Sequence, residues 1–174
     1  DALAELEGAI HQREGLMLLT GLSGTGKSSL LEELARRLMR GGKTTPIVFT
    51  NPLITFSKLV HTVHDRLFPE QQPAANIEEL LAQINKELTS SRTRGWTIAI
   101  LVDEAQHLPT DTLAQLGRLL KMKSGDGNVF QIILVGQPDL TARFDTRRLD
   151  HLAKLIRCKC EVTSLDDEET RSYI

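Results

Sequence analysis

Apolar positions along the chain fall into two patterns. Four short runs are almost wholly apolar, which is typical of strands that are buried on both faces of a sheet. They occupy residues 16–20, 46–50, 97–102 and 130–135, and a fifth strand is predicted at about 157–162. In the segments between the runs, apolar residues recur every three or four positions, as in Leu30, Leu31, Leu34 and Leu38, and charged residues lie between them. This second pattern predicts amphipathic helices.

We predict helices at residues 2–12, 28–40, 55–68, 77–90, 110–122 and 140–156, and the start of another from Asp166. Gly41-Gly42 is a helix-ending signal after the second of them. Strands that are buried on both faces and separated by helices indicate a parallel sheet with helices on each side. The predicted fold is therefore α/β, a three-layer αβα sandwich around a five-stranded parallel sheet.

Size and composition limit the alternatives. A chain of 174 residues is long enough for one such domain and too short for two. With a net charge of −2, the chain as a whole does not attract nucleic acid or anionic lipid, so such a contact needs a local patch. No apolar run reaches the ~20 residues of a membrane span. Cys158 and Cys160, the only cysteines, are expected to be buried reduced thiols. We expect the chain to be a piece of a longer protein.

A glycine-rich segment follows the first strand. Gly21-Leu-Ser-Gly-Thr-Gly-Lys-Ser28 matches the phosphate-loop pattern G-x-x-x-x-G-K-[ST], and it lies between a predicted strand and a predicted helix. Glycines let the backbone wrap around phosphate, and the helix presents its positive end to the same group. Lys27 is expected to reach the β- and γ-phosphates of ATP, and the Ser28 hydroxyl to bind Mg²⁺. The other expected ATP contacts are Gly21, Ser23, Gly24, Thr25, Gly26 and Ser29.

Two carboxylates end the third strand. Ligands of an open parallel sheet bind at the carboxyl ends of its strands, so Asp103 and Glu104 should lie beside the phosphate loop. Asp103 is expected to hold Mg²⁺ through the water shell of the ion. Glu104 is the expected general base for the attacking water. An acidic pair after a strand can also be a helix cap, and the phosphate loop is what favours catalysis here.

Gln137 follows the fourth strand in Ile133-Leu-Val-Gly-Gln137-Pro138. Its side chain would lie between the phosphate loop and the strand that carries Asp103. From the residues alone it could contact the γ-phosphate or the attacking water, or it could be a turn residue before Pro138.

Together, these motifs resemble the AAA+ P-loop ATPases. The phrases REGLMLLTGLSGTGKSSLL, ILVDEAQHL and IILVGQPDL are similar to the ATPase domain of the general secretion pathway protein A (ExeA-like) family, and the similarity continues to SLDDEETRSYI. The resemblance implies the strand order 5-1-4-3-2 and a sensor-1 role for Gln137. It also implies a core at residues 1–164, followed at 165–174 by the start of a truncated helical lid.

The chain departs from this family at one place. The family tends to carry Leu-Arg-Gln-Arg before the last strand, where it is a source of a finger that completes a neighbour's site. Here the stretch is Leu152-Ala-Lys-Leu155. Arg147, Arg148, Lys154 and Arg157 are the candidate substitutes, and the alternative is that they form a solvated basic surface. Residues 141–159 hold six basic and two acidic side chains, a patch that could also meet nucleic acid.

The predicted activity is Mg-dependent binding and hydrolysis of ATP. By resemblance it drives conformational change in a bacterial secretion or cell-envelope assembly, with a cytoplasmic domain that the longer protein ties to the inner membrane. The expected partners are ATP and either further copies of the chain or a membrane-linked assembly, and nucleic acid is the less favoured partner. The alternatives are a DNA-transaction ATPase of the transposition-helper type and an ATP-dependent switch with little turnover.

Overall fold

Five parallel strands form the centre of the computed structural model, which describes residues 1–90, 95–125 and 127–163. The strands are β1 (Leu16–Gly21), β2 (Thr44–Phe49), β3 (Thr97–Val102), β6 (Phe130–Gly136) and β7 (Ile156–Val162). They lie side by side in the order β2-β3-β6-β1-β7, and every pairing is parallel. Counted along the chain this is the order 5-1-4-3-2, so the predicted sheet is confirmed.

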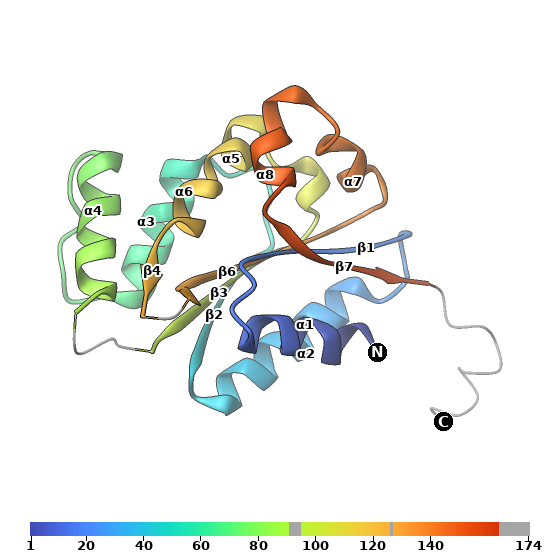
Figure 1. The fold of residues 1–174 in the computed structure, drawn as a ribbon, viewed down its shortest axis with the longest axis horizontal. Helices are drawn as coiled ribbons and strands as arrows, with labels where there is room; N and C mark the ends of the chain where they lie inside the picture. The colour runs from blue at the N-terminus through green and yellow to red at the C-terminus, as the bar shows by residue number, and fades with distance from the viewer. Residues whose placement is uncertain (91–94, 126, 164–174) are drawn as a thin grey trace.

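Helices cover both faces of this sheet (Figure 1). One face carries α1 (Ala2–His11) and α2 (Lys27–Gly41). The other face carries the remaining helices of the described residues, which are α3 (Phe56–Leu67), α4 (Ile77–Leu88), η2 (Ala105–His107), α5 (Thr110–Gln115), α6 (Gly117–Leu120), α7 (Asp139–Arg143), η3 (Arg147–Leu149) and α8 (Asp150–Ala153). The three-layer αβα sandwich is therefore confirmed.

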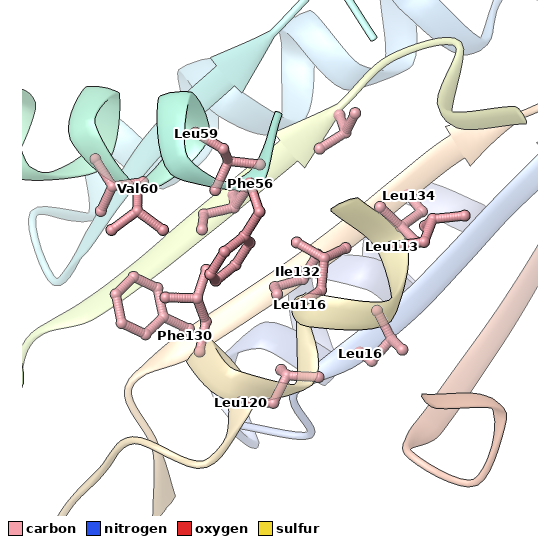
Figure 2. Close-up of a cluster of buried hydrophobic side chains, with 14 of the residues drawn as sticks. Leu16, Phe56, Leu59, Val60, Leu113, Leu116, Leu120, Phe130, Ile132 and Leu134 are labelled. Carbon is pink, nitrogen blue, oxygen red and sulfur yellow. The ribbon is translucent and has the colours of Figure 1, made fainter. Parts of the chain in front are cut away.

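The side chains of the strands alternate between two hydrophobic cores. In β1, Leu16 and Leu18 pack in the core under α3–α8, whereas Met17 and Leu19 pack in the core under α1 and α2. All four are at most 1% exposed, which explains why the central strands are apolar runs rather than alternating ones. Figure 2 shows part of the larger core, where Phe56 and Leu59 of α3 meet Phe130 and Ile132 of β6.

Local signals set the ends of the longer helices. Gly26 and Gly42 flank α2 with left-handed backbone angles (φ 82° and 68°), which glycine adopts without steric cost. The hydroxyl of Thr55 accepts a hydrogen bond from the Lys58 amide (3.2 Å) at the start of α3. The Asn76 side chain accepts one from Glu79 (2.9 Å) at the start of α4. These caps satisfy amides that the first turn leaves without helical partners.

Two predicted helices were wrong in their extent. The helix predicted at 110–122 is divided into α5 and α6, because the Leu116 amide bonds the Leu113 carbonyl three residues back and tightens the turn. The helix predicted at 140–156 is divided into α7, η3 and α8. Here Thr146 has an extended backbone, and its hydroxyl donates to the Arg143 carbonyl (3.0 Å), which competes with continued helix.

Smaller differences lie at the edges of the fold. Strand β2 begins two residues before the predicted start at Pro46, and it is an edge strand, so proline is tolerated there. A two-stranded antiparallel ladder, β4 (Lys123–Ser124) with β5 (Gly127–Asn128), was not predicted. The predicted lid at 165–174 lies outside the described residues. None of the helices in the described part of the chain is both long and apolar enough to cross a membrane.

The two cysteines lie on β7 and are buried and free, as expected. Their sulfur atoms are 3.5 Å apart, and Cys158 Sγ is 3.6 Å from the Glu5 carboxylate on α1. Burial raises the pKa of both the Cys158 and the Cys160 thiol, with the proximity of the Glu5 carboxylate adding to the effect. The thiols are therefore held protonated as part of the core beside α1.

Candidate nucleotide site

The phosphate loop connects the carboxyl end of β1 to the first turn of α2. Gly24 and Gly26 both have positive φ angles (79° and 82°), so the predicted glycines stand where the backbone requires them. No side chain caps the start of α2. The N–H groups of its first turn are consequently free to bind an anion, and the 15-residue helix directs its positive end toward the loop.

Gly21 is packed too closely for any larger residue. A Cβ atom at this position would lie 2.5 Å from the Val162 carbonyl oxygen and 2.8 Å from the Thr25 hydroxyl. Strand β7 therefore runs directly alongside the base of the loop, and the loop rests on the β1–β7 pair.

Lys27 lies inside the curve of the loop. The residue is only 6% exposed, and its ammonium donates a hydrogen bond to the Leu22 carbonyl at 2.7 Å. The Thr25 hydroxyl donates to the same carbonyl at 2.8 Å. A buried cation held against the backbone of the loop is well placed to bind phosphate oxygens. Ser23, Gly24, Gly26 and Ser29 are exposed around it.

Ser28 and Asp103 meet although they are 75 residues apart in the chain. The Ser28 hydroxyl donates to Asp103 Oδ2 at 2.7 Å, while Asp103 Oδ1 accepts from the Glu104 amide at 2.8 Å. The Asp103 amide donates to the Phe49 carbonyl at the end of β2, which anchors this end of β3. A hydroxyl and a carboxylate are the oxygen ligands that Mg²⁺ prefers, so the pair that was predicted as metal ligands fits this ion.

Glu104 has an unusual backbone conformation. Its φ and ψ of 50° and 38° place it in the left-handed region, which residues other than glycine seldom adopt and which costs free energy. The conformation turns the chain sharply from β3 into η2. Such strain persists where the surroundings hold it. Glu104 is partly exposed, whereas the preceding Asp103 is buried.

Gln106, the third residue after Asp103, was not singled out from the sequence. It is only 7% exposed, and its two side-chain ends have different partners. Its Nε2 donates to Glu104 Oε2, and its Oε1 accepts from the backbone amide of Gln137 at 3.2 Å. The partner segment lies 31 residues away, so only the folded sheet brings it near.

Arg143 of α7 contacts the segment that carries Gln106, and it was also not singled out from the sequence. Its guanidinium donates to the Gln106 carbonyl at 2.9 Å and to the Thr110 hydroxyl at 3.1 Å. Burial lowers the pKa of Arg143, and the nearby Asp139 partly offsets this effect. The guanidinium stays charged, because its ordinary pKa is far above neutral pH.

Gln137 lies at the carboxyl end of β6, between β1 and β3 in the sheet. This is the position predicted between the phosphate loop and Asp103. Its backbone amide joins the Gln106 network, and its side chain is partly exposed. The sensor-1 role of that side chain stays a prediction.

The four candidate finger residues are all exposed. Arg148 forms an ion pair with Asp111, and Lys154 pairs with Asp150 at 2.8 Å. Arg147 and Arg157 are exposed. The segment predicted as one basic helix is thus several short elements, with two of its cations paired within the chain.

Comparisons with known proteins agree with this geometry. Residues 10–144 match a family described as "AAA domain". The chain is 29% identical over its whole length to General secretion pathway protein A of Aeromonas hydrophila, of which it spans 31%.

Solved structures with the same fold include ORC2 of Aeropyrum pernix in ADPNP-ADP complexes, with a TM-score of 0.73 and 15% identity. The alignment covers 99% of this chain and 48% of that one. Drosophila ORC bound to DNA gives a TM-score of 0.74 and 19% identity, covering 99% of this chain and 44% of that one. The chain thus spans less than half the length of these relatives. The phosphate loop, the acidic strand end, the sheet order and the matched region agree, and the chain belongs to the AAA domain family, with the fold of the AAA+ ATPases.

Proposed function

We propose that the protein binds ATP with Mg²⁺ and hydrolyses it at the carboxyl edge of the sheet. The hydrogen bond between Ser28 and Asp103 carries the proposal, because it joins the phosphate loop to the acidic strand end at the place where a metal-bound triphosphate would lie. Membership in the AAA domain family supports it, as does the A. pernix ORC2 structure in ADPNP-ADP complexes.

Different residues of the site would bind the phosphates and the Mg²⁺ ion. Lys27 and the amides of the loop and of α2 would bind the phosphates and stabilise negative charge on the γ-phosphoryl group. Ser28 and Asp103 would hold Mg²⁺, which neutralises charge on the β- and γ-phosphate oxygens. Gly21, Ser23, Gly24, Thr25, Gly26 and Ser29 would line the phosphate site. Gln137 would contact the γ-phosphate or the attacking water.

Glu104 would act as the general base. The oxygen of water attacks the γ-phosphorus, the bond to the β–γ bridging oxygen breaks, and the proton of the water passes to the Glu104 carboxylate. The products are ADP and phosphate. Glu104 follows the buried Asp103 directly and is itself partly exposed, so it can reach a water that Asp103 cannot.

The wider role rests on similarity to General secretion pathway protein A. We propose that hydrolysis drives conformational change in a secretion or cell-envelope assembly on the cytoplasmic side of a membrane. The site would be completed by further copies of the chain or by a membrane-linked partner.

A second candidate is an ATPase of DNA transactions. The exposed Arg147 and the fold that the chain shares with ORC proteins favour it. Binding of duplex DNA that weakens with salt, and weakens further in Arg147→Ala/Arg148→Ala, would support this role. Absence of binding at low salt would reject it.

Phosphate release from ATP tests the proposed activity directly. Wild-type protein should release phosphate with Mg²⁺ and not with excess chelator. Asp103→Asn keeps the size of the side chain and removes its charge, so it should shift the Mg²⁺ dependence to higher concentrations. Hydrolysis that needs no divalent cation, or that Asp103→Asn leaves unchanged, would contradict the proposed site.

A further inference from the structure

The side chain of Gln106 connects the segments that follow β3 and β6, both of which take part in the proposed reaction. It lies in η2, immediately after the turn that carries Glu104, and it contacts the start of the segment after β6. We propose that Gln106 is a positioning residue, which holds the Glu104 carboxylate through its amide nitrogen and ties that carboxylate to the backbone of Gln137. The proposal rests on the proposed function of Glu104.

Chemistry fixes the orientation of the Gln106 amide. The Gln137 backbone N–H can only donate, so the atom 3.2 Å from it must be the acceptor Oε1. The other end is then the NH₂ group, and it faces the Glu104 carboxylate, which can only accept when ionised. Both ends of the amide are therefore satisfied, and exchanging its oxygen and nitrogen would break both contacts.

The surroundings leave Gln106 little freedom. A Cβ atom on Gly136 would lie 2.4 Å from Gln106 Oε1, so the residue before Gln137 must be glycine for the amide to fit. On the other side, Arg143 binds the carbonyl of Gln106 itself. The side chain is thus buried and bonded to the backbone just after β6, while α7 holds the backbone carbonyl of the same residue. Glu104, by contrast, is partly exposed and has a strained backbone.

These contacts give Gln106 a role that a packing residue lacks. A displacement of the segment after β6, where Gln137 would meet the γ-phosphate, would move the Gln137 amide and with it Gln106. The Glu104 carboxylate would then change position. The network therefore couples the γ-phosphate end of the site to the orientation of the general base.

Two substitutions distinguish the hydrogen bond from Gln106 to Glu104 from the one that Gln106 accepts from the Gln137 amide. Gln106→Met keeps the approximate shape and removes both hydrogen bonds. Gln106→Glu keeps an acceptor for the Gln137 amide and replaces the donor to Glu104 by a like charge. We expect both variants to bind ATP with a Kd within about threefold of wild type, because the side chain of Gln106 bonds to Glu104 and to the backbone of Gln137 rather than to the phosphate loop. We expect kcat to fall by about 10-fold to 100-fold, as for a reacting group displaced by about 1 Å.

The pH dependence distinguishes positioning from a general structural effect. In Gln106→Glu the introduced carboxyl, next to Glu104, takes up a proton at mildly acidic pH and can then donate again. The kcat of this variant should therefore recover relative to wild type as the pH falls from about 8 to about 6. Gln106→Met should show no such recovery. Hydrogen exchange of the Gln137 amide should accelerate in Gln106→Met and stay slow in Gln106→Glu.

The outcomes are distinct. Wild-type kcat in both variants, while Glu104→Gln is inactive, would overturn the positioning role and leave the proposed function intact. Equal hydrolysis by wild type and Glu104→Gln would overturn the role of Glu104, and that of Gln106 with it. Loss of kcat without recovery of Gln106→Glu at lower pH would also overturn the proposal, since it would indicate a purely structural effect.

Discussion

Lys27 is the residue on which phosphate binding depends most directly. Replacing Lys27 with alanine removes the cation inside the loop, and a hydrogen bond from a charged group contributes about 1.5–3 kcal/mol, so the Kd for Mg-ATP should rise at least about tenfold. Titration with a fluorescent ATP analogue measures this. Lys43→Ala, at an exposed lysine before β2, is the control and should bind normally. Equal affinity in both variants would contradict the role of Lys27.

A substitution at Gly136 tests the packing of this residue against Gln106 and Leu140. In Gly136→Ala the new methyl group would meet Gln106 Oε1 and the Leu140 side chain, and overpacking of this kind should destabilise the fold by about 1–3 kcal/mol. Chemical denaturation measures the loss. Gly8→Ala is the matched control, because nothing lies within 4 Å of a Cβ there and alanine favours helix. Gly8→Ala should leave the stability equal or higher.

The elements around the site depend on Arg143, which connects α7 to η2. Arg143→Ala removes hydrogen bonds to the Gln106 carbonyl and to the Thr110 hydroxyl, so the free energy of unfolding should fall by about 1–3 kcal/mol. The measurement is the denaturation midpoint of Arg143→Ala, and the control is Arg147→Ala, because the Arg147 side chain is exposed. If the two variants were equally stable, α7 would not depend on this contact.

The same elements show what the sequence can predict. Strand β3 was placed correctly at both ends, because all six of its residues are buried and the five that follow Thr97 are apolar. The position of Asp103 beside the phosphate loop was likewise predicted, since each is a local pattern of residue types, and their roles toward ATP and Mg²⁺ stay predictions. The breaks at Leu116 and Thr146 were not found, because an apolar spacing of three or four continues through tight turns as it does through a helix.

The network of Gln106 could not be predicted for a different reason. Its donor and acceptor partners belong to segments that lie far apart in the sequence and that the parallel pairing of β3 and β6 brings together. Neither Gly136 nor Gln106 forms part of a recognisable motif in its own segment. Their close packing is visible only in the folded structure. Arg143 was counted as one member of a basic patch, whereas it is in fact partly buried.

At the scale of the whole molecule, the proposed site is expected to need a neighbour. Of the four candidate finger residues, Arg148 and Lys154 are paired within the chain, whereas Arg147 and Arg157 are exposed and are the ones that a neighbouring copy would supply. We therefore predict that the ATPase rate per chain rises with protein concentration. Adding Glu104→Gln protein to a fixed amount of wild type should also raise the rate, whereas the same mass of an unrelated protein should not. A flat rate would indicate that each chain works alone.

ATP binding and turnover, measured together in wild type and in Glu104→Gln, test whether this chain hydrolyses ATP with Glu104 as the general base. We predict a Kd for Mg-ATP within about threefold of wild type. We predict that kcat falls by about 10²-fold to 10⁴-fold, because the substitution removes only the proton acceptor. Continued hydrolysis by Glu104→Gln at the wild-type rate would contradict the proposed mechanism.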